Sequence, residues 1–88
     1  MFFVYALYSE THNKIYIGYS SNPEKRLLSH NDDRNLGWTG KFQSWKIVYT
    51  ERCDLKTEAL KREKQLKSAS GRKFVWNLVI SDKTHTEH

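Results

Sequence analysis

The sequence predicts a small α+β domain in which a three-stranded antiparallel sheet is flanked by helices. Three observations predict it. The chain has 88 residues, which allows one domain. Three short apolar or alternating segments have the length of strands, and helix-capping signals follow the second and the third of them. The predicted order is strand, strand, helix, strand, helix and a short terminal element.

Three segments are the expected strands. Phe2 to Tyr8 is largely apolar in both of its alternating sets, which suits a strand covered on both faces. Lys14 to Tyr19 follows after a polar turn at residues 9–13 and alternates between two faces. Trp45 to Glu51 has an apolar centre and forms the third strand. The first two strands are expected to pair as a hairpin.

The register of this hairpin decides which side chains share a sheet face. If Tyr8 lies opposite Asn13, then Tyr5 lies directly opposite Tyr16, which puts two phenols side by side. Tyrosines in strands are more often ordinary packing residues, and that reading also stands for this pair. Gly18 is less expected inside a strand and indicates a close backbone approach or a bulge nearby.

Polar caps mark two helices. Residues 20–31 open with serines, an asparagine and a proline, which predicts a helix start at Ser21 or Asn22 and an end near Asn31. Asp54 is the expected cap of a second helix, which runs to about Lys67 and is broken by residues 68–71.

The remaining segments carry weaker signals. Residues 31–44 are polar and contain glycine, so we expect a loop. Residues 72–79 fit either a short helix or an extended segment. The domain is expected to cover residues 1–80, and the polar residues 81–88 to form a disordered tail.

The composition favours a polyanionic partner. Fifteen Lys and Arg against ten Asp and Glu give a net charge of +5 and a pI of about 9.4. The alternative is a small basic protein that binds nothing charged. The single Cys53 excludes an internal disulfide framework. The sequence has neither an apolar run of about 18 residues nor a signal peptide, so we expect a cytoplasmic protein without membrane segments.

Glu63 is the most informative candidate residue. At about 100° per residue of helix, it falls near the middle of an apolar arc whose origin is taken at Leu55. The other members of this arc are Ala59, Leu60 and Leu66. A carboxylate on an apolar face is costly unless it is paired or ligates a metal. Both explanations stay open: an ion pair with Arg26 or a helix lysine, or a metal site.

Arg26 and His30 are four residues apart and share one helix face. Arginine has a planar fork of donors that fits phosphate oxygens. Histidine can serve as acid, base or donor near neutral pH. The alternative for both is a pair of exposed polar residues on a half-buried helix.

Taken together, these residues resemble the GIY-YIG nuclease superfamily. The second half of its name is literal as Tyr16-Ile17-Gly18, whereas Phe3-Val4-Tyr5 keeps only the tyrosine of the first half. The family's arginine helix, third strand and glutamate helix are matched by residues 20–31, 45–51 and 58–67. The resemblance covers Phe2 to Leu78 and is greatest to the short, stand-alone bacterial subfamily UPF0213.

The resemblance implies a metal-dependent endonuclease that hydrolyses DNA phosphodiester bonds, directed to repair or recombination structures. Glu63 would weakly hold one Mg²⁺ or Mn²⁺ ion, and Arg26 would clamp the phosphate. A tyrosine would orient or deprotonate water, with Tyr16 favoured over Tyr5 and His30 as a further candidate base. The alternative function is a non-catalytic nucleic-acid-binding module on the same fold.

DNA is the expected partner, and the protein is expected to be a monomer or weak dimer. Six basic residues are candidates for backbone contacts: Lys25, Arg34, Lys41, Lys64, Lys67 and Arg72. With the aromatic residues of the 31–44 loop they would form a rim around the site. A solvated charged surface explains the same residues equally well.

Overall fold

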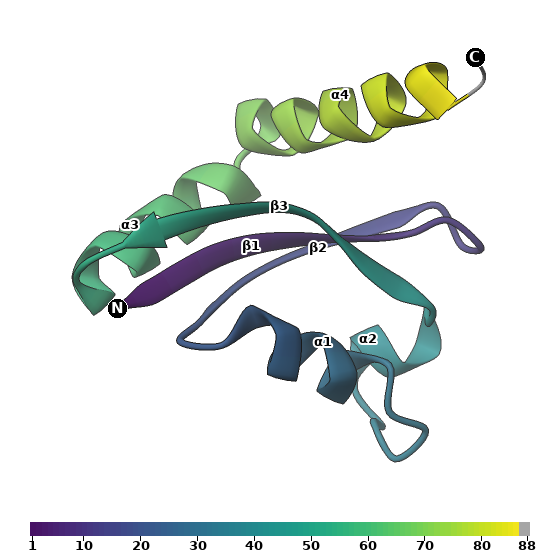
Figure 1. The fold of residues 1–88 in the computed structure, drawn as a ribbon, viewed down its shortest axis with the longest axis horizontal. Coiled ribbons are helices and arrows are strands. Elements are labelled where there is room, and N and C mark those ends of the chain that lie inside the picture. The colour runs from purple at the N-terminus through teal and green to yellow at the C-terminus, as the bar shows by residue number, and fades with distance from the viewer. Residues whose placement is uncertain (87–88) are drawn as a thin grey trace.

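The structure is a computed structural model and describes residues 1–86 (Figure 1). The elements are β1 (Phe2–Ser9), β2 (Lys14–Ser20), α1 (Pro23–His30), α2 (Trp38–Lys41), β3 (Trp45–Cys53), α3 (Lys56–Lys67) and α4 (Ala69–Thr86). Within this range the strands form one antiparallel sheet in the order β2-β1-β3. The predicted α+β class, strand pairing and order of elements are confirmed.

The sheet separates two layers of helix, with α3 and α4 on one side and α1 and α2 on the other (Figure 1). The central strand β1 is buried on both faces, as its apolar pattern predicts. Val4, Ala6 and Tyr8 pack towards α3 and α4. Tyr5 and Leu7 point to the opposite layer. The alternation of β1 thus places Tyr5 in the layer of α1 and α2.

The hairpin register differs from the predicted one by two residues. Tyr8 pairs with Ile15 and Ser9 with Lys14, so the turn extends through Asn13. The predicted pairing of Tyr8 with Asn13 was wrong because Asn13 adopts a φ of 53°, in the left-handed region that ends a turn and has no place in a strand. The Asn13 side chain instead accepts a hydrogen bond from the Tyr8 hydroxyl at 3.3 Å.

The same shift moves Tyr5 opposite Gly18 and Tyr16 opposite Leu7, so Tyr5 and Tyr16 are not direct neighbours across the strands. They stay on one face because a shift of two residues preserves the alternation. Their ring centroids are 6.3 Å apart. A Cβ atom at Gly18 would lie 2.8 Å from the Tyr5 hydroxyl oxygen. A close approach at Gly18 is therefore present, but the Tyr5 phenol makes it and not the backbone segment that was expected.

The two predicted helix starts have different outcomes. Asn22 caps α1 by accepting a hydrogen bond from the Lys25 amide at 3.1 Å, as the sequence predicts. Asp54 does not cap α3. The cap position is Leu55, whose amide donates to the Glu58 carboxylate at 3.0 Å, one arm of a capping box.

The C-terminal segment is helical. α4 begins directly after Ser68, whose hydroxyl accepts a hydrogen bond from the Gly71 amide at 3.3 Å, so the expected break is reduced to a short junction. Of the expected polar tail, residues 81–86 continue α4, and residues 87 and 88 lie outside the described residues. None of the helices in the described part of the chain is long and apolar enough to cross a membrane.

Residues 31–44 are more ordered than the predicted loop, since they contain α2. The Asn31 side chain bonds the backbone of Trp45 twice, accepting from its amide at 2.7 Å and donating to its carbonyl at 2.9 Å. The Trp45 indole donates to the Thr39 carbonyl at 2.7 Å. These bonds hold α2 over the Tyr5 face of the sheet.

Candidate active site

A buried hydrogen-bond chain connects α2, α1 and β1. The Tyr5 hydroxyl oxygen lies 3.0 Å from His30 Nε2, and His30 Nδ1 lies 2.9 Å from Thr39 Oγ1. The Asn35 side-chain amide donates to the same Thr39 oxygen at 2.8 Å. His30 is only 4% exposed and Thr39 8%. Both nitrogens of the imidazole are therefore bonded to groups from other elements.

The hydrogen bonds of Asn35 determine which group donates at each step of this chain. The Asn35 Oδ1 accepts from the Gly37 amide at 2.9 Å, which directs the NH₂ group of Asn35 to Thr39. Since Thr39 Oγ1 accepts from Asn35, its own proton is available for His30 Nδ1. A neutral His30 then carries its proton on Nε2 and donates to Tyr5. This tautomer is assigned from the bond network.

Charge and burial support the neutral imidazole. Burial lowers the pKa of His30, and the positive charge of Arg26 lowers it further. Burial of Tyr5 raises the pKa of its phenol. The guanidinium of Arg26 beside the phenol acts in the opposite direction, whereas Tyr16 and the charge of Glu63 raise the pKa further. Arg26 from α1 and Glu63 from α3 thus shift the pKa of the same phenol in opposite directions.

A cleft opens beside this chain. Its lining residues are Tyr16, Arg26, Ser29, His30, Asn35, Trp38 and Thr39. The rings of Tyr16 and His30 are in contact, with centroids 4.7 Å apart. Three of the predicted site residues therefore line one cleft. Tyr5 lies beneath it, bonded to His30.

Sequence reasoning missed Asn35, Thr39 and Ser29 as parts of this cleft. Residues 31–44 have no periodicity that would show which side chains point inwards. The separation of nine positions between His30 and Thr39 matches no helix or strand repeat. A threonine beside an exposed tryptophan gave no usable signal, and only the fold brings Thr39 to His30.

Glu63 lies at the flank of the buried face of α3 and not at its middle. Ala59 and Leu66 are buried, but Leu55 and Leu60 are 60% and 43% exposed. The predicted apolar arc was wrong at these two positions. Leu55 was a poor origin because it precedes the helix with extended backbone angles, so it occupies no place on the helical face. The carboxylate of Glu63 is 17% exposed and bonds Lys67 Nζ at 3.0 Å, the helix-lysine pair left open by the sequence.

The donor set fits only a weakly held metal ion. Among the residues described, no group of three or more His, Cys, Asp or Glu side chains is arranged to hold a metal. Glu63 provides hard carboxylate oxygens, which suit Mg²⁺ or Mn²⁺. Mg²⁺ is commonly held by one or two carboxylates together with waters and substrate phosphates. The site is thus compatible with an ion shared between Glu63 and a bound phosphate.

The six predicted basic residues are all exposed and fall into two groups. Lys25, Arg34 and Lys41 come from the α1–α2 layer, and Lys64, Lys67 and Arg72 from α3 and α4. Two of the six are internally paired: Arg34 with Asp32 at 2.8 Å and Lys67 with Glu63. Hydrogen bonds from Arg34 lower the pKa of Asp32 to about 2.

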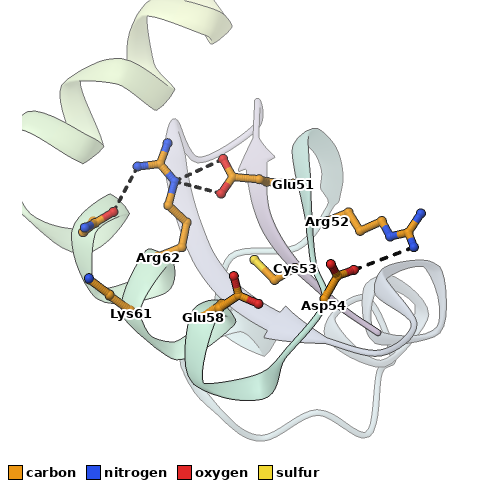
Figure 2. Close-up of a pocket in the computed structure, with 8 residues that line it drawn as sticks. Glu51, Arg52, Cys53, Asp54, Glu58, Lys61 and Arg62 are labelled. Carbon is orange, nitrogen blue, oxygen red and sulfur yellow. Dashed lines mark hydrogen bonds and ion pairs between the residues drawn. The ribbon is translucent and has the colours of Figure 1, made fainter.

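A second hollow lies between β3 and α3 (Figure 2). In it the Arg62 side chain points to Glu51, and its Nε lies 3.1 and 3.0 Å from the two carboxylate oxygens. Tyr49 donates to the same carboxylate at 2.7 Å. Burial raises the pKa of the Cys53 thiol in this region, which disfavours the reactive thiolate. Arg62 and Glu51 pair with each other across the two elements, so we regard this cluster as a structural link between β3 and α3.

Comparison with known proteins agrees with the geometry. A sequence model of the GIY-YIG catalytic domain matches residues 1–78. The fold and this match define a chain that belongs to the GIY-YIG family, as the motifs indicated. More particularly, it is similar to proteins of the UPF0213 group.

Three of these relatives illustrate the similarity. A UPF0213 protein of Staphylococcus saprophyticus is 39% identical over 59 residues, 67% of this chain and 72% of the relative. One from Natronomonas pharaonis is 35% identical over 82 residues, 93% of each chain. One from Bacillus licheniformis is 38% identical over 56 residues, 64% of this chain and 58% of the relative. No solved structure matches.

Proposed function

We propose that the protein is an endonuclease that hydrolyses DNA phosphodiester bonds at the site of Tyr5, Tyr16, Arg26, His30 and Glu63. One observation carries the proposal. His30 bonds an almost completely buried phenol beneath a cleft that Tyr16 and Arg26 line. A buried phenol with a donor network behind it and opposite charges beside it suits proton transfer next to a phosphate.

Arg26 is the residue that binds the substrate phosphate in this proposal. It lines the open cleft, and its planar fork can donate two hydrogen bonds to non-bridging oxygens. Tyr5 takes the proton of the attacking water as the water oxygen bonds to phosphorus and the P–O bond to the leaving group breaks. His30 Nε2–H and Arg26 stabilise the phenolate that this role requires.

Tyr5 replaces Tyr16 as the favoured base for a geometric reason. Tyr5 has the hydrogen bond to His30, and the guanidinium of Arg26 lowers its pKa against the effect of burial. Tyr16 contacts the His30 ring at a tilt of 52° and lines the cleft, which suits it to position the water or the phosphate. His30 is assigned as a donor and not as a base because its Nδ1 accepts from Thr39 in the assigned tautomer.

Glu63 would hold the single Mg²⁺ or Mn²⁺ ion. When bound, the ion supplies positive charge to the phosphate and the leaving oxygen. Lys67 bonds one of the two carboxylate oxygens of Glu63, so a metal ion would compete with that ammonium for the carboxylate. Competition from Lys67 agrees with weak metal binding that strengthens when a substrate phosphate is present.

The test is cleavage of single-stranded, branched and supercoiled DNA with Mg²⁺ or Mn²⁺. Glu63→Ala should abolish the product, whereas Glu10→Gln, an exposed carboxylate in the hairpin turn, should cut as the wild type does. Both variants are checked for folding by thermal unfolding. Equal cleavage by wild type and Glu63→Ala would remove the assignment of Glu63.

The second candidate is a non-catalytic nucleic-acid-binding module. The ion pair between Lys67 and Glu63 favours it, because a paired carboxylate is less available to a metal. This candidate predicts DNA binding that falls with salt, survives Glu63→Ala and yields no product. A role in DNA repair or recombination belongs to the endonuclease proposal. The cytoplasmic location and the monomeric or weakly dimeric state stay predictions from the sequence.

A further inference from the structure

Trp38 is a large aromatic side chain left half in water. It is 50% exposed although it belongs to α2, next to the buried Thr39. Burying an aromatic side chain removes about 150–250 Å² of surface from water. Because Trp38 stays half exposed, the fold gains only part of this hydrophobic stabilisation. An aromatic surface of this kind near a cleft is a candidate contact for a ligand.

The indole has a rigid support. Its ring centroid lies 5.8 Å from that of Trp45, at an interplanar angle of 35°, and 4.9 Å from that of Phe42. Trp45 is 4% exposed and bonds the Thr39 carbonyl at 2.7 Å, so the support is tied to α2 itself. Little ordering entropy remains to be lost when a ligand binds to a side chain held in this way.

The position of Trp38 relates it to the proposed chemistry. Trp38 lines the same cleft as Tyr16, Arg26 and His30. Its neighbour Thr39 bonds His30 directly at 2.9 Å. Exposed Lys25 and Lys41 add positive charge on the same layer. A planar apolar group attached to a phosphate chain would complement this combination of indole and cations.

We propose that Trp38 is a stacking platform for an unpaired nucleobase adjacent to the phosphate held by Arg26. Bases in a duplex are already stacked on their neighbours, so an indole reaches a base face only where the strand is single or the base is flipped out. The inference rests on the proposed function and narrows it. The substrate is DNA with unpaired nucleotides, and stacking makes the contact tolerant of sequence.

The experiment measures binding in EDTA, so that cleavage does not interfere. The ligands are a single-stranded oligothymidylate, a blunt duplex of equal length and a strand of abasic residues with the same number of phosphates. The variants are Trp38→Ala, Trp38→Phe and Phe74→Ala, the last removing an aromatic residue that is 40% exposed on α4, on the opposite layer. Thermal unfolding verifies that each variant is folded.

Trp38→Ala should weaken binding to the single strand about tenfold while changing binding to the duplex and abasic strands less than about twofold. Trp38→Phe should retain most of the affinity and Phe74→Ala all of it. In the wild type, a 2-aminopurine base in the strand should lose fluorescence on binding, and Trp38→Ala should abolish that loss. Equal weakening on all three ligands, or unchanged single-strand binding by folded Trp38→Ala, overturns the inference.

The two proposals fail in different ways. If the wild type yields no product with Mg²⁺ or Mn²⁺ but the stacking results hold, the endonuclease proposal fails and Trp38 remains a binding platform. If the wild type cuts single-stranded and duplex DNA equally, and Trp38→Ala retains that pattern, the platform fails and the endonuclease stands.

Discussion

The hydroxyl oxygen of Tyr5 and Nε2 of His30 lie 3.0 Å apart, and this bond joins the central strand to the end of α1. Both residues are almost completely buried. Burial raises the pKa of this phenol and disfavours its ionised form, so a proton-accepting role requires His30 Nε2–H and Arg26 to stabilise the phenolate. The packing of α1 against β1 therefore positions the group that we propose as the base.

Tyr5→Phe should lower the single-turnover rate of DNA cleavage by about 10²- to 10⁴-fold, the usual contribution of a general base. Tyr16→Phe should lower it less, because Tyr16 lines the cleft without a described bond to His30. Cleavage by the wild type should rise with pH across the neutral range, since burial raises the pKa of Tyr5. A larger loss in Tyr16→Phe than in Tyr5→Phe would return the base assignment to Tyr16.

Thr39→Val should misalign His30 without changing the size of the side chain at position 39. It removes the donor to His30 Nδ1 and the acceptor for Asn35. Loss of a buried hydrogen bond that leaves its partner unsatisfied costs about 1–3 kcal/mol of unfolding free energy. Thr39→Ser should restore both stability and rate, as measured by denaturant unfolding and single-turnover cleavage. Failure of Thr39→Ser to restore the rate would show that the hydroxyl at position 39 does not determine the cleavage rate.

Much of the fold was predictable because its signals are local. The alternation of β1 and β2, the cap at Asn22 and the Tyr16-Ile17-Gly18 motif are all contained in short segments. The register of the β1–β2 hairpin was not predictable, because the left-handed backbone of Asn13 depends on the turn that forms. The arc on α3 failed at Leu55 for a similar reason, since the helix begins one residue later.

The site was predictable only in part. Tyr5, Tyr16, Arg26, His30 and Glu63 could be named from spacing and resemblance. Asn35 and Thr39 could not, because they lie in an aperiodic segment whose path is determined by contacts to Trp45 and His30. The charge of Glu63 was visible in the sequence, but its pairing with Lys67 required the structure.

Gly18→Ala should destabilise the protein through Tyr5. The added methyl would lie 2.8 Å from the phenolic oxygen and 3.0 Å from its ring carbon, so the ring must move. Overpacking of this kind typically costs about 1–3 kcal/mol. The cost should be smaller in a Tyr5→Phe background, which lacks the oxygen. Thermal or denaturant unfolding of the four proteins measures this coupling, and equal costs in both backgrounds would contradict the contact.

Stability should fall as the pH is lowered from neutral towards 5. The folded pKa of His30 lies below its ordinary value of 6.5, so the unfolded chain binds the proton more readily. The stability contributed by neutral His30 is present above that value and is lost as the pH falls from it towards the folded pKa. His30→Gln should reduce this pH dependence, whereas His12→Asn, at an exposed turn position, should leave it unchanged. An identical pH dependence in His30→Gln and wild type would show that His30 is not its source.

The most direct test of the central claim is a double-mutant cycle on single-turnover DNA cleavage, with Tyr5→Phe, His30→Gln and the double variant. Because the two residues act as one unit, each single change should cost nearly as much as both together. Losses that multiply in the double variant, or no cleavage by the wild type above the Glu63→Ala background, would contradict the account.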